Sequence, residues 1–121
     1  MPEEDYAVRQ LEKFAGHDIK PSLLHGDLWA GNFLISDDGV PYLIDPAVFY
    51  GHFEVDLAMT RLFGGFSTHF YSAYGEVNGD AKQKIRCELY QLYYLLVHLN
   101  MFGLSYQQAC LAITKKYLAK T

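Results

Sequence analysis

The sequence feature that most constrains the fold is a tight turn between two short apolar runs. Residues 33–35 and 42–44 are strand-forming runs, and residues 36–39 between them contain an Asp-Gly pair, which favours a β-hairpin. Pro46 follows the second run and blocks further strand pairing. Because a hairpin folds the chain back on itself, the loops before and after it are expected to lie side by side.

Most of the remaining chain has the spacing of apolar residues that is typical of helices. Residues 81–101 show it best, because apolar side chains recur there every three or four positions and Asp80 is placed to cap the helix. The predicted fold class is α+β, mainly helical with one small β-hairpin. Shorter helices are expected over residues 2–15, 55–63, 67–74 and 106–119.

Composition excludes several classes of protein. Half of the residues are hydrophobic and 20% are charged, so the chain is not a disordered tail. Ten Lys and Arg against fourteen Asp and Glu give a net charge of −4, which disfavours nucleic-acid binding. Two cysteines, Cys87 and Cys110, are too few for a disulfide scaffold. No apolar run approaches the ~20 residues that span a bilayer. We expect a cytoplasmic protein with no nucleic-acid or membrane partner.

Polar residues gather in the two loops that flank the predicted hairpin. His25, Asp27 and Asn32 precede it, and Asp45 follows it. Because the hairpin brings its ends together, the Asn32 amide oxygen and the Asp45 carboxylate form a hard oxygen site suited to Mg²⁺. Asp27 supplies a second carboxylate at the front of the same loop. Phosphoryl transfer from ATP uses such a set, in which metal ions neutralise phosphate charge and one carboxylate orients the attacking hydroxyl.

The spacing in these loops matches the protein-kinase pattern H-R-D-L-x-x-x-N followed by D-F-G. Residues 25–32 are H-G-D-L-W-A-G-N, and D-P-A begins at Asp45. Gly26 replaces the arginine of the pattern, which resembles the small-molecule kinases of the aminoglycoside phosphotransferase type. Pro46 replaces the phenylalanine, so the sequence lacks the mobile Phe switch of protein kinases.

A longer series of motifs begins in these loops and runs into the predicted helices. It comprises residues 23–32 (L-L-H-G-D-L-W-A-G-N), 43–52 (L-I-D-P-A-V-F-Y-G-H), 54–59 (E-V-D-L-A-M), 62–66 (L-F-G-G-F), 90–93 (Y-Q-L-Y) and 99–103 (L-N-M-F-G). Together they resemble the fructosamine kinase (ketosamine-3-kinase) family over roughly residues 21–118. The resemblance implies a protein-kinase-like fold and ATP-dependent phosphorylation of the sugar C3 hydroxyl in ketosamines, which are products of protein glycation.

The resemblance also implies roles for individual residues. Asp27 resembles the catalytic base, and Asn32 and Asp45 resemble the Mg²⁺ ligands of an ATP site. Asp56 resembles the buried helix carboxylate that holds the catalytic-loop backbone in kinase-like folds. His25 is expected to brace the same loop. The expected partner is a small-molecule or protein-bound ketosamine.

Other residues have weaker assignments. We place Trp29 at the sugar site as a hypothesis, because an indole face packs well on a sugar ring. His52 and Glu54 either reach the substrate pocket or face solvent, with neither reading favoured. His98 is expected to be a surface or satisfied core histidine. Tyr94 and its neighbouring tyrosines are expected in the core or at an interface.

The resemblance exposes a gap before the catalytic loop. Kinase-like enzymes use an N-terminal lobe with a phosphate-covering loop and a strand lysine. Only 24 residues precede His25, and they contain neither feature. We therefore expect residues 1–121 to be part of a C-terminal lobe, with catalytic and metal loops at 23–48 and a helical region at 53–119. The N-terminal nucleotide lobe is expected to be absent, and the chain is expected to be inactive alone.

Open apolar faces of such a part-lobe favour association, so we expect a homo-oligomer. Two alternatives to the ketosamine kinase stay open at this point. One is a kinase of the same fold that acts on another small hydroxyl compound, such as an aminoglycoside or choline. The other is a non-catalytic fragment that self-associates.

Overall fold

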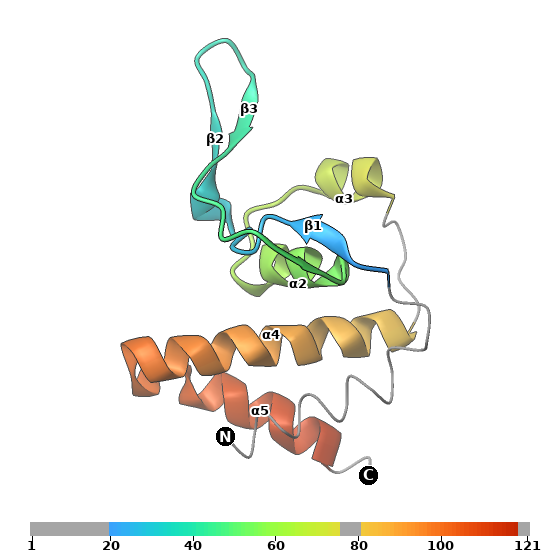
Figure 1. Ribbon diagram of the computed structural model, residues 1–121. Helices are drawn as coiled ribbons and strands as arrows, with labels where there is room; N and C mark the ends of the chain where they lie inside the picture. The colour runs from blue at the N-terminus through green and yellow to red at the C-terminus, as the bar shows by residue number, and fades with distance from the viewer. Residues whose placement is uncertain (1–19, 76–80, 119–121) are drawn as a thin grey trace.

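In the computed structural model, the described residues are 20–75 and 81–118, so the helix predicted over residues 2–15 lies outside them. The fold is α+β, as predicted, with a helical body and small sheets above it (Figure 1). The strands are β1 (Ser22–Leu24), β2 (Phe33–Ile35), β3 (Pro41–Leu43) and β4 (Phe49–Gly51). The α-helices are α2 (Glu54–Leu62), α3 (Thr68–Tyr74), α4 (Ala81–Phe102) and α5 (Gln107–Leu118), and 3₁₀ turns span Ala30–Asn32 and Leu104–Tyr106.

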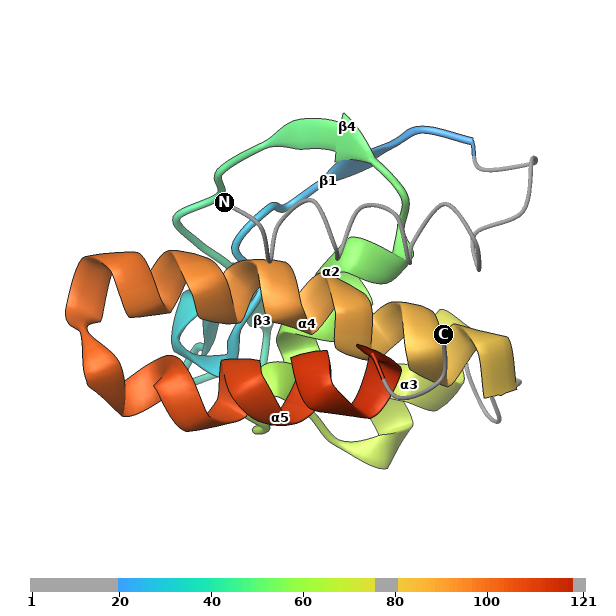
Figure 2. The ribbon, with the colours of Figure 1, turned by 90° about the horizontal axis from the view of Figure 1, so that it is seen from below.

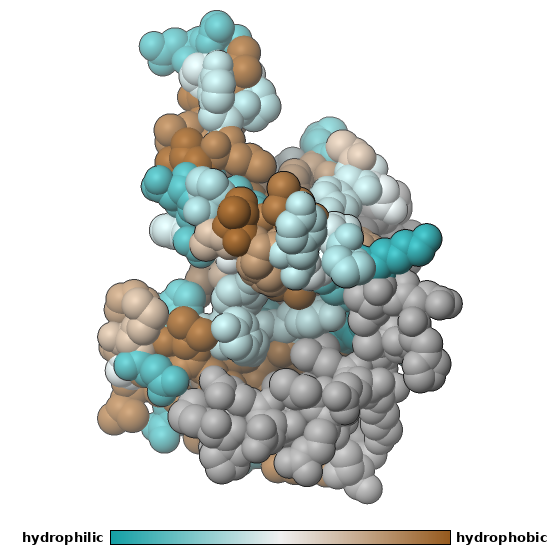
Figure 3. All heavy atoms as spheres, in the orientation of Figure 1, coloured by the Kyte–Doolittle hydropathy of each residue, from teal (hydrophilic) through white to brown (hydrophobic). Residues whose placement is uncertain are grey.

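The predicted hairpin is present as the antiparallel pair β2–β3, with Phe33 opposite Leu43. Its turn is closed by hydrogen bonds from the Gly39 amide to the Ser36 carbonyl and from the Ser36 amide to the Val40 carbonyl. Strand β3 begins at Pro41, one residue earlier than predicted. The hairpin projects from the body, and Figure 3 shows a hydrophilic tip above apolar residues.

A second sheet, which the sequence did not predict, pairs β1 with β4 in antiparallel register, Ser22 opposite Gly51 and Leu24 opposite Phe49. These strands are only three residues long and lie far apart in sequence, so no local pattern reveals their pairing. The sheet joins the start of the catalytic loop to the end of the segment after the hairpin. It therefore brings both polar loops back to one place above α2 (Figure 1).

The helices form the body beneath the sheets. Helix α2 packs on α4, and α5 runs back along α4 after the turn at residues 103–106 (Figures 1 and 2). The core between α4 and α5 consists of Leu92, Leu95, Leu96 and Cys110. Within the part of the chain that the structure describes, no helix is both long enough and apolar enough to cross a membrane.

Helix bounds lie within a residue or two of the prediction, with one local difference. Helix α5 starts at Gln107, because residues 104–106 form a 3₁₀ turn before it. Gly103 at the start of that turn has φ +93°, a left-handed conformation that glycine adopts without strain. This reversal turns the chain back along α4 and places Tyr106 in the wall of the pocket described below.

Candidate active site

The backbone of residues 25–27, in the loop predicted to be catalytic (the catalytic loop below), is held by a carboxylate from α2. Asp56 is 8% exposed, and its two oxygens accept hydrogen bonds from the His25 amide at 2.8 Å and the Gly26 amide at 3.0 Å. Hydrogen bonds to an ionised acceptor are about twice as strong as neutral ones. Asp56 thus occupies the position expected of a loop-holding carboxylate.

The His25 ring ties the catalytic loop to the segment after the hairpin. Its Nδ1 accepts a hydrogen bond from the Asp27 amide at 3.2 Å, so the ring proton lies on Nε2 and is donated to the Ile44 carbonyl at 2.8 Å. The His25 carbonyl also accepts from the Ala47 amide at 2.8 Å. These contacts on either side of Asp45 fix its loop against the catalytic loop.

Glycine is the only residue type that fits at position 26. Its φ is +87°, and a Cβ placed there would lie 1.9 Å from the carbonyl oxygen of Ala47. Both the left-handed backbone and the close approach exclude a side chain. The departure from the arginine of the protein-kinase pattern therefore has a steric cause in the packing of these two loops.

Asn32 and Asp27 form the polar centre of the site. The Asn32 side chain is buried, and its Nδ2 donates to the Asp27 backbone carbonyl at 2.9 Å and to Asp27 Oδ2 at 3.1 Å. With Nδ2 engaged twice, the amide orientation is fixed and Oδ1 is directed away from these contacts. The Asn32 carbonyl accepts from the Ile44 amide at 2.9 Å, which places Asp45 one residue from this pair.

Asp45 has φ +49°, the only positive φ of a non-glycine residue in the described ranges. A strained backbone of this kind often occurs at functional sites. The described residues contain no cluster of three or more His, Cys, Asp or Glu that could hold a metal ion. Asn32 Oδ1 and the Asp45 carboxylate are hard oxygen donors, which fits Mg²⁺ held largely by phosphate oxygens and water rather than by an all-protein cage.

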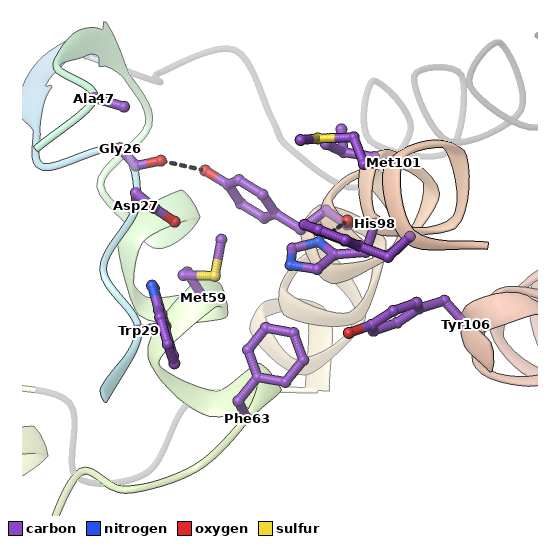
Figure 4. Close-up of a pocket in the computed structure, with 12 residues that line it drawn as sticks. Gly26, Asp27, Trp29, Ala47, Met59, Phe63, His98, Met101 and Tyr106 are labelled. Carbon is purple, nitrogen blue, oxygen red and sulfur yellow. Dashed lines mark hydrogen bonds between the residues drawn. The ribbon is translucent and has the colours of Figure 1, made fainter. Parts of the chain in front are cut away.

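A pocket of about 690 Å³ opens beside the catalytic loop. Asp27 lies on its loop side, and Trp29, Phe63, His98 and Tyr106 surround the space (Figure 4). The Trp29 ring meets the Phe63 ring edge-on, with 6.4 Å between centroids. It also lies over Gly31, where an added Cβ would be 2.2 Å from the indole. The absence of a side chain at that glycine allows the indole to occupy the pocket wall.

Two pocket residues from α4 that carry polar groups, Tyr94 and His98, were not predicted as site residues. Tyr94 is 8% exposed, and its hydroxyl donates to the Gly26 carbonyl at 3.4 Å, the dashed line in Figure 4. His98 Nδ1 lies 2.7 Å from the Tyr94 carbonyl, to which it can only donate, so Nε2 is the unprotonated nitrogen in the neutral ring. No short motif links these residues to the catalytic loop, because the Tyr94–Gly26 contact spans 68 positions. Only the tyrosine-rich character of the helix hinted at them.

The structure does not bring His52 and Glu54 to this pocket. The Glu54 carboxylate is buried and pairs with Arg86 through two hydrogen bonds, of 2.7 Å from Nε and 2.8 Å from an Nη. His52 Nδ1 lies 3.0 Å from the Tyr90 hydroxyl. Burial lowers the pKa of His52, Glu54 opposes this, and Arg86 adds to it. Both residues belong to a buried polar cluster that joins β4 and α2 to α4, neither in the pocket nor facing solvent.

Comparisons with known proteins identify the family of this chain. A family model described as fructosamine kinase matches residues 3–120. The chain belongs to the fructosamine kinase family. It is 56% identical over 102 residues to a "Probable ketoamine kinase" of Lactiplantibacillus plantarum and 46% identical over 103 residues to the "Ketosamine-3-kinase" of Mus musculus. Each match covers 84% of this chain.

The fold is also that of a solved relative. A crystal structure of a "putative fructosamine-3-kinase" from Thermobifida fusca superposes with a TM-score of 0.80 at 36% identity, over 98% of this chain. The chain covers 41% of that structure, 36% of the Lactiplantibacillus protein and 33% of the mouse protein. It thus spans about a third to two fifths of the length of its relatives.

Proposed function

We propose that this chain supplies the catalytic loop and the acceptor pocket for phosphorylation of a ketosamine by ATP, at the sugar C3 hydroxyl. The observation that carries the proposal is the position of Asp27. Its side chain lines the aromatic pocket and also accepts a hydrogen bond from Asn32, which we propose as a Mg²⁺ ligand. The Asp27 carboxylate therefore lies between the pocket proposed for the acceptor and the side proposed for the phosphate.

In this proposal, Asp27 orients the acceptor hydroxyl and accepts its proton as the γ-phosphoryl group is transferred. Asn32 Oδ1 and the Asp45 carboxylate would hold Mg²⁺, which neutralises charge on the phosphates of ATP. His25 and Asp56 keep the loop in place, so that little reorganisation is needed during the reaction. The chain's own contribution is thus mainly positioning and electrostatic.

The lining of the pocket supports a ketosamine as acceptor. The Trp29 indole offers a flat face for a sugar ring, and the neighbouring rings of Phe63 and Tyr106 surround the space with aromatic surface. Aromatic faces also attract cations, and the amine nitrogen of a ketosamine is protonated near neutral pH. If Trp29→Phe left acceptor affinity unchanged, the sugar-stacking part of the proposal would be wrong.

Transfer requires more than the residues present here. The sequence has no Gly-rich phosphate loop and no strand lysine of the kinase type, and the relatives are more than twice as long. We therefore propose that the 121-residue chain is inactive alone and needs a nucleotide-binding part, which we place in the portion of the relatives that this chain does not match. We also propose a cytoplasmic location, because two cysteines are too few for the disulfide scaffold of a small secreted protein.

A hybrid enzyme tests the proposal. The segment of mouse ketosamine-3-kinase that matches this chain is replaced by the corresponding residues of the chain, and transfer from Mg²⁺-ATP to a fructosyl-amine is measured beside the unmodified enzyme. The proposal expects transfer by the hybrid and none by the isolated chain. A folded hybrid that transfers phosphate to choline or an aminoglycoside but not to a fructosyl-amine would favour a related small-molecule kinase instead.

We also propose that the isolated chain self-associates. The projecting hairpin leaves large apolar side chains open to solvent, among them Ile35 at 66% and Leu43 at 60% exposure. A lone two-stranded hairpin is marginal in water, so contact with another surface stabilises it. Sedimentation at a concentration of about 10⁻⁵ M should show a dimer or larger species. A compact monomer would contradict this proposal.

A further inference from the structure

The polar backbone groups around Asp27 are held from several directions. Asp56 accepts the amides of His25 and Gly26, the His25 ring accepts the amide of Asp27, and the Ala47 amide donates to the His25 carbonyl. The Gly26 carbonyl, directly before Asp27, is held by none of these groups. This carbonyl and the Asp27 amide belong to one peptide unit, so a contact to the carbonyl adds a second constraint on a peptide plane that His25 holds from the amide side.

The hydroxyl of Tyr94 supplies the missing contact. It reaches the Gly26 carbonyl from α4 at 3.4 Å, whereas Asp56 reaches the same loop from α2. The bond is long, and bonds at catalytic sites are often long without ligand and tighten when the site fills. Tyr94 also lines the pocket, so an acceptor entering the pocket meets the ring that holds the loop (Figure 4).

The Tyr94 hydroxyl remains a hydrogen-bond donor over the neutral pH range. Burial raises the pKa of Tyr94 well above its usual value, and the carboxylates of Asp56 and Asp27 raise it further. The phenol therefore keeps its proton throughout the neutral range and remains a donor to the Gly26 carbonyl. Tyr93, the next residue, is 52% exposed and does not line the pocket, so it provides a matched control on the same helix.

We propose that Tyr94 is a positioning residue: by holding the Gly26 carbonyl, it fixes the peptide plane before Asp27 and with it the direction of the Asp27 carboxylate. The part of this inference that concerns catalysis rests on the proposed function, whereas the part that concerns the loop does not. The substitution Tyr94→Phe removes the hydroxyl but keeps the ring, so the packing of α4 is retained.

The first test is amide hydrogen exchange in the 121-residue chain, measured by NMR for Tyr94→Phe and Tyr93→Phe. Loss of one neutral hydrogen bond should speed exchange at the amides of Gly26 and Asp27 roughly three- to tenfold. Exchange in the core of α4, for example at Leu96, should stay as in the wild type. A uniform change across all elements would indicate a merely structural role, and unchanged exchange at residues 25–27 would equally overturn the inference.

The second test is kinetic and uses the hybrid enzyme. Tyr94→Phe should lower kcat about three- to tenfold with KM within about twofold, because a displaced Asp27 affects transfer rather than acceptor binding. A rise in KM at constant kcat would overturn the positioning role, since it would make Tyr94 a substrate contact. If the unsubstituted hybrid transfers no phosphate while Tyr94→Phe still loosens the loop, the proposed function fails and the inference about the loop stands.

Discussion

Removal of the Asp56 carboxylate should destabilise the fold, because the backbone of residues 25 and 26 loses its hydrogen-bond acceptor. In Asp56→Ala, the amides of His25 and Gly26 lose their acceptor while the loop stays half-buried. An unsatisfied buried donor costs about 1–3 kcal/mol, so two cost about 2–6 kcal/mol. Water entering the space left by the truncated side chain relieves part of this cost. We expect a loss of about 2–4 kcal/mol in the free energy of unfolding, a large fraction of the total for a small domain.

The substitution Asp56→Asn tests the contribution of the hydrogen bonds at nearly constant side-chain volume. The amide keeps one oxygen acceptor, but its NH₂ group faces the second backbone amide, so one of the two bonds is lost. We expect a smaller loss of about 1–3 kcal/mol. Asp37→Ala, at the exposed hairpin tip, should change stability by less than about 0.5 kcal/mol.

Urea unfolding of the three variants and the wild type provides the measurement, with equal m-values required for the comparison. The expected order of destabilisation is Asp56→Ala, then Asp56→Asn, then Asp37→Ala. If Asp56→Ala were no less stable than the Asp37→Ala control, Asp56 would not hold the loop, and the account of how the catalytic residue is positioned would fail.

Three further predictions concern Gly26 and the polar cluster of His52, Glu54 and Arg86. Gly26→Ala should lower the free energy of unfolding by at least about 2 kcal/mol, because the φ of +87° and the Ala47 carbonyl both oppose a Cβ. Thermal unfolding measures this loss. An unchanged unfolding midpoint would show that the two loops are not packed this closely. Arg86→Ala should cost about 3–5 kcal/mol by urea unfolding, because Glu54 is left buried without its cation, and an effect below about 1 kcal/mol would argue against a buried pair. His52 has a lowered pKa in the folded state, so the unfolded state binds more protons below the ordinary value of 6.5 and stability should fall as pH drops from about 7 to 5. Replacing His52 with Gln should flatten this pH dependence, and an unchanged slope would assign it to other groups.

The contacts within the predicted catalytic loop could be anticipated from the sequence because they are local. Asp27 and Asn32 are five positions apart and contact each other directly, and a two-strand hairpin is enough to bring Asp45 back beside them. Position 26 requires glycine for two reasons. One is local, its positive φ, and the other is the close approach of the Ala47 carbonyl from a later segment. The helices were readable because their apolar spacing persists over many residues.

The features that the sequence did not predict depend on contacts between segments that are distant in the chain. The β1–β4 sheet pairs three-residue strands that have no pattern of their own. Tyr94 and His98 enter the pocket because the packing of α4 on α2 places this helix beside the loop. For His52 and Glu54 the sequence left pocket and solvent equally open, and their observed partners lie on α4: Arg86 pairs with Glu54, and the Tyr90 hydroxyl lies beside His52.

The most direct test of the central claim is phosphate transfer from Mg²⁺-ATP to a fructosyl-amine by the hybrid enzyme, with and without Asp27→Asn. This substitution keeps the shape of the side chain but removes the carboxylate that would accept the hydroxyl proton. The account predicts transfer by the hybrid and a fall in kcat of about 10²–10⁴-fold in the variant, with the thermal unfolding midpoint unchanged. A variant that keeps its kcat within a few-fold of the unsubstituted hybrid would contradict the assignment of Asp27 as the catalytic base.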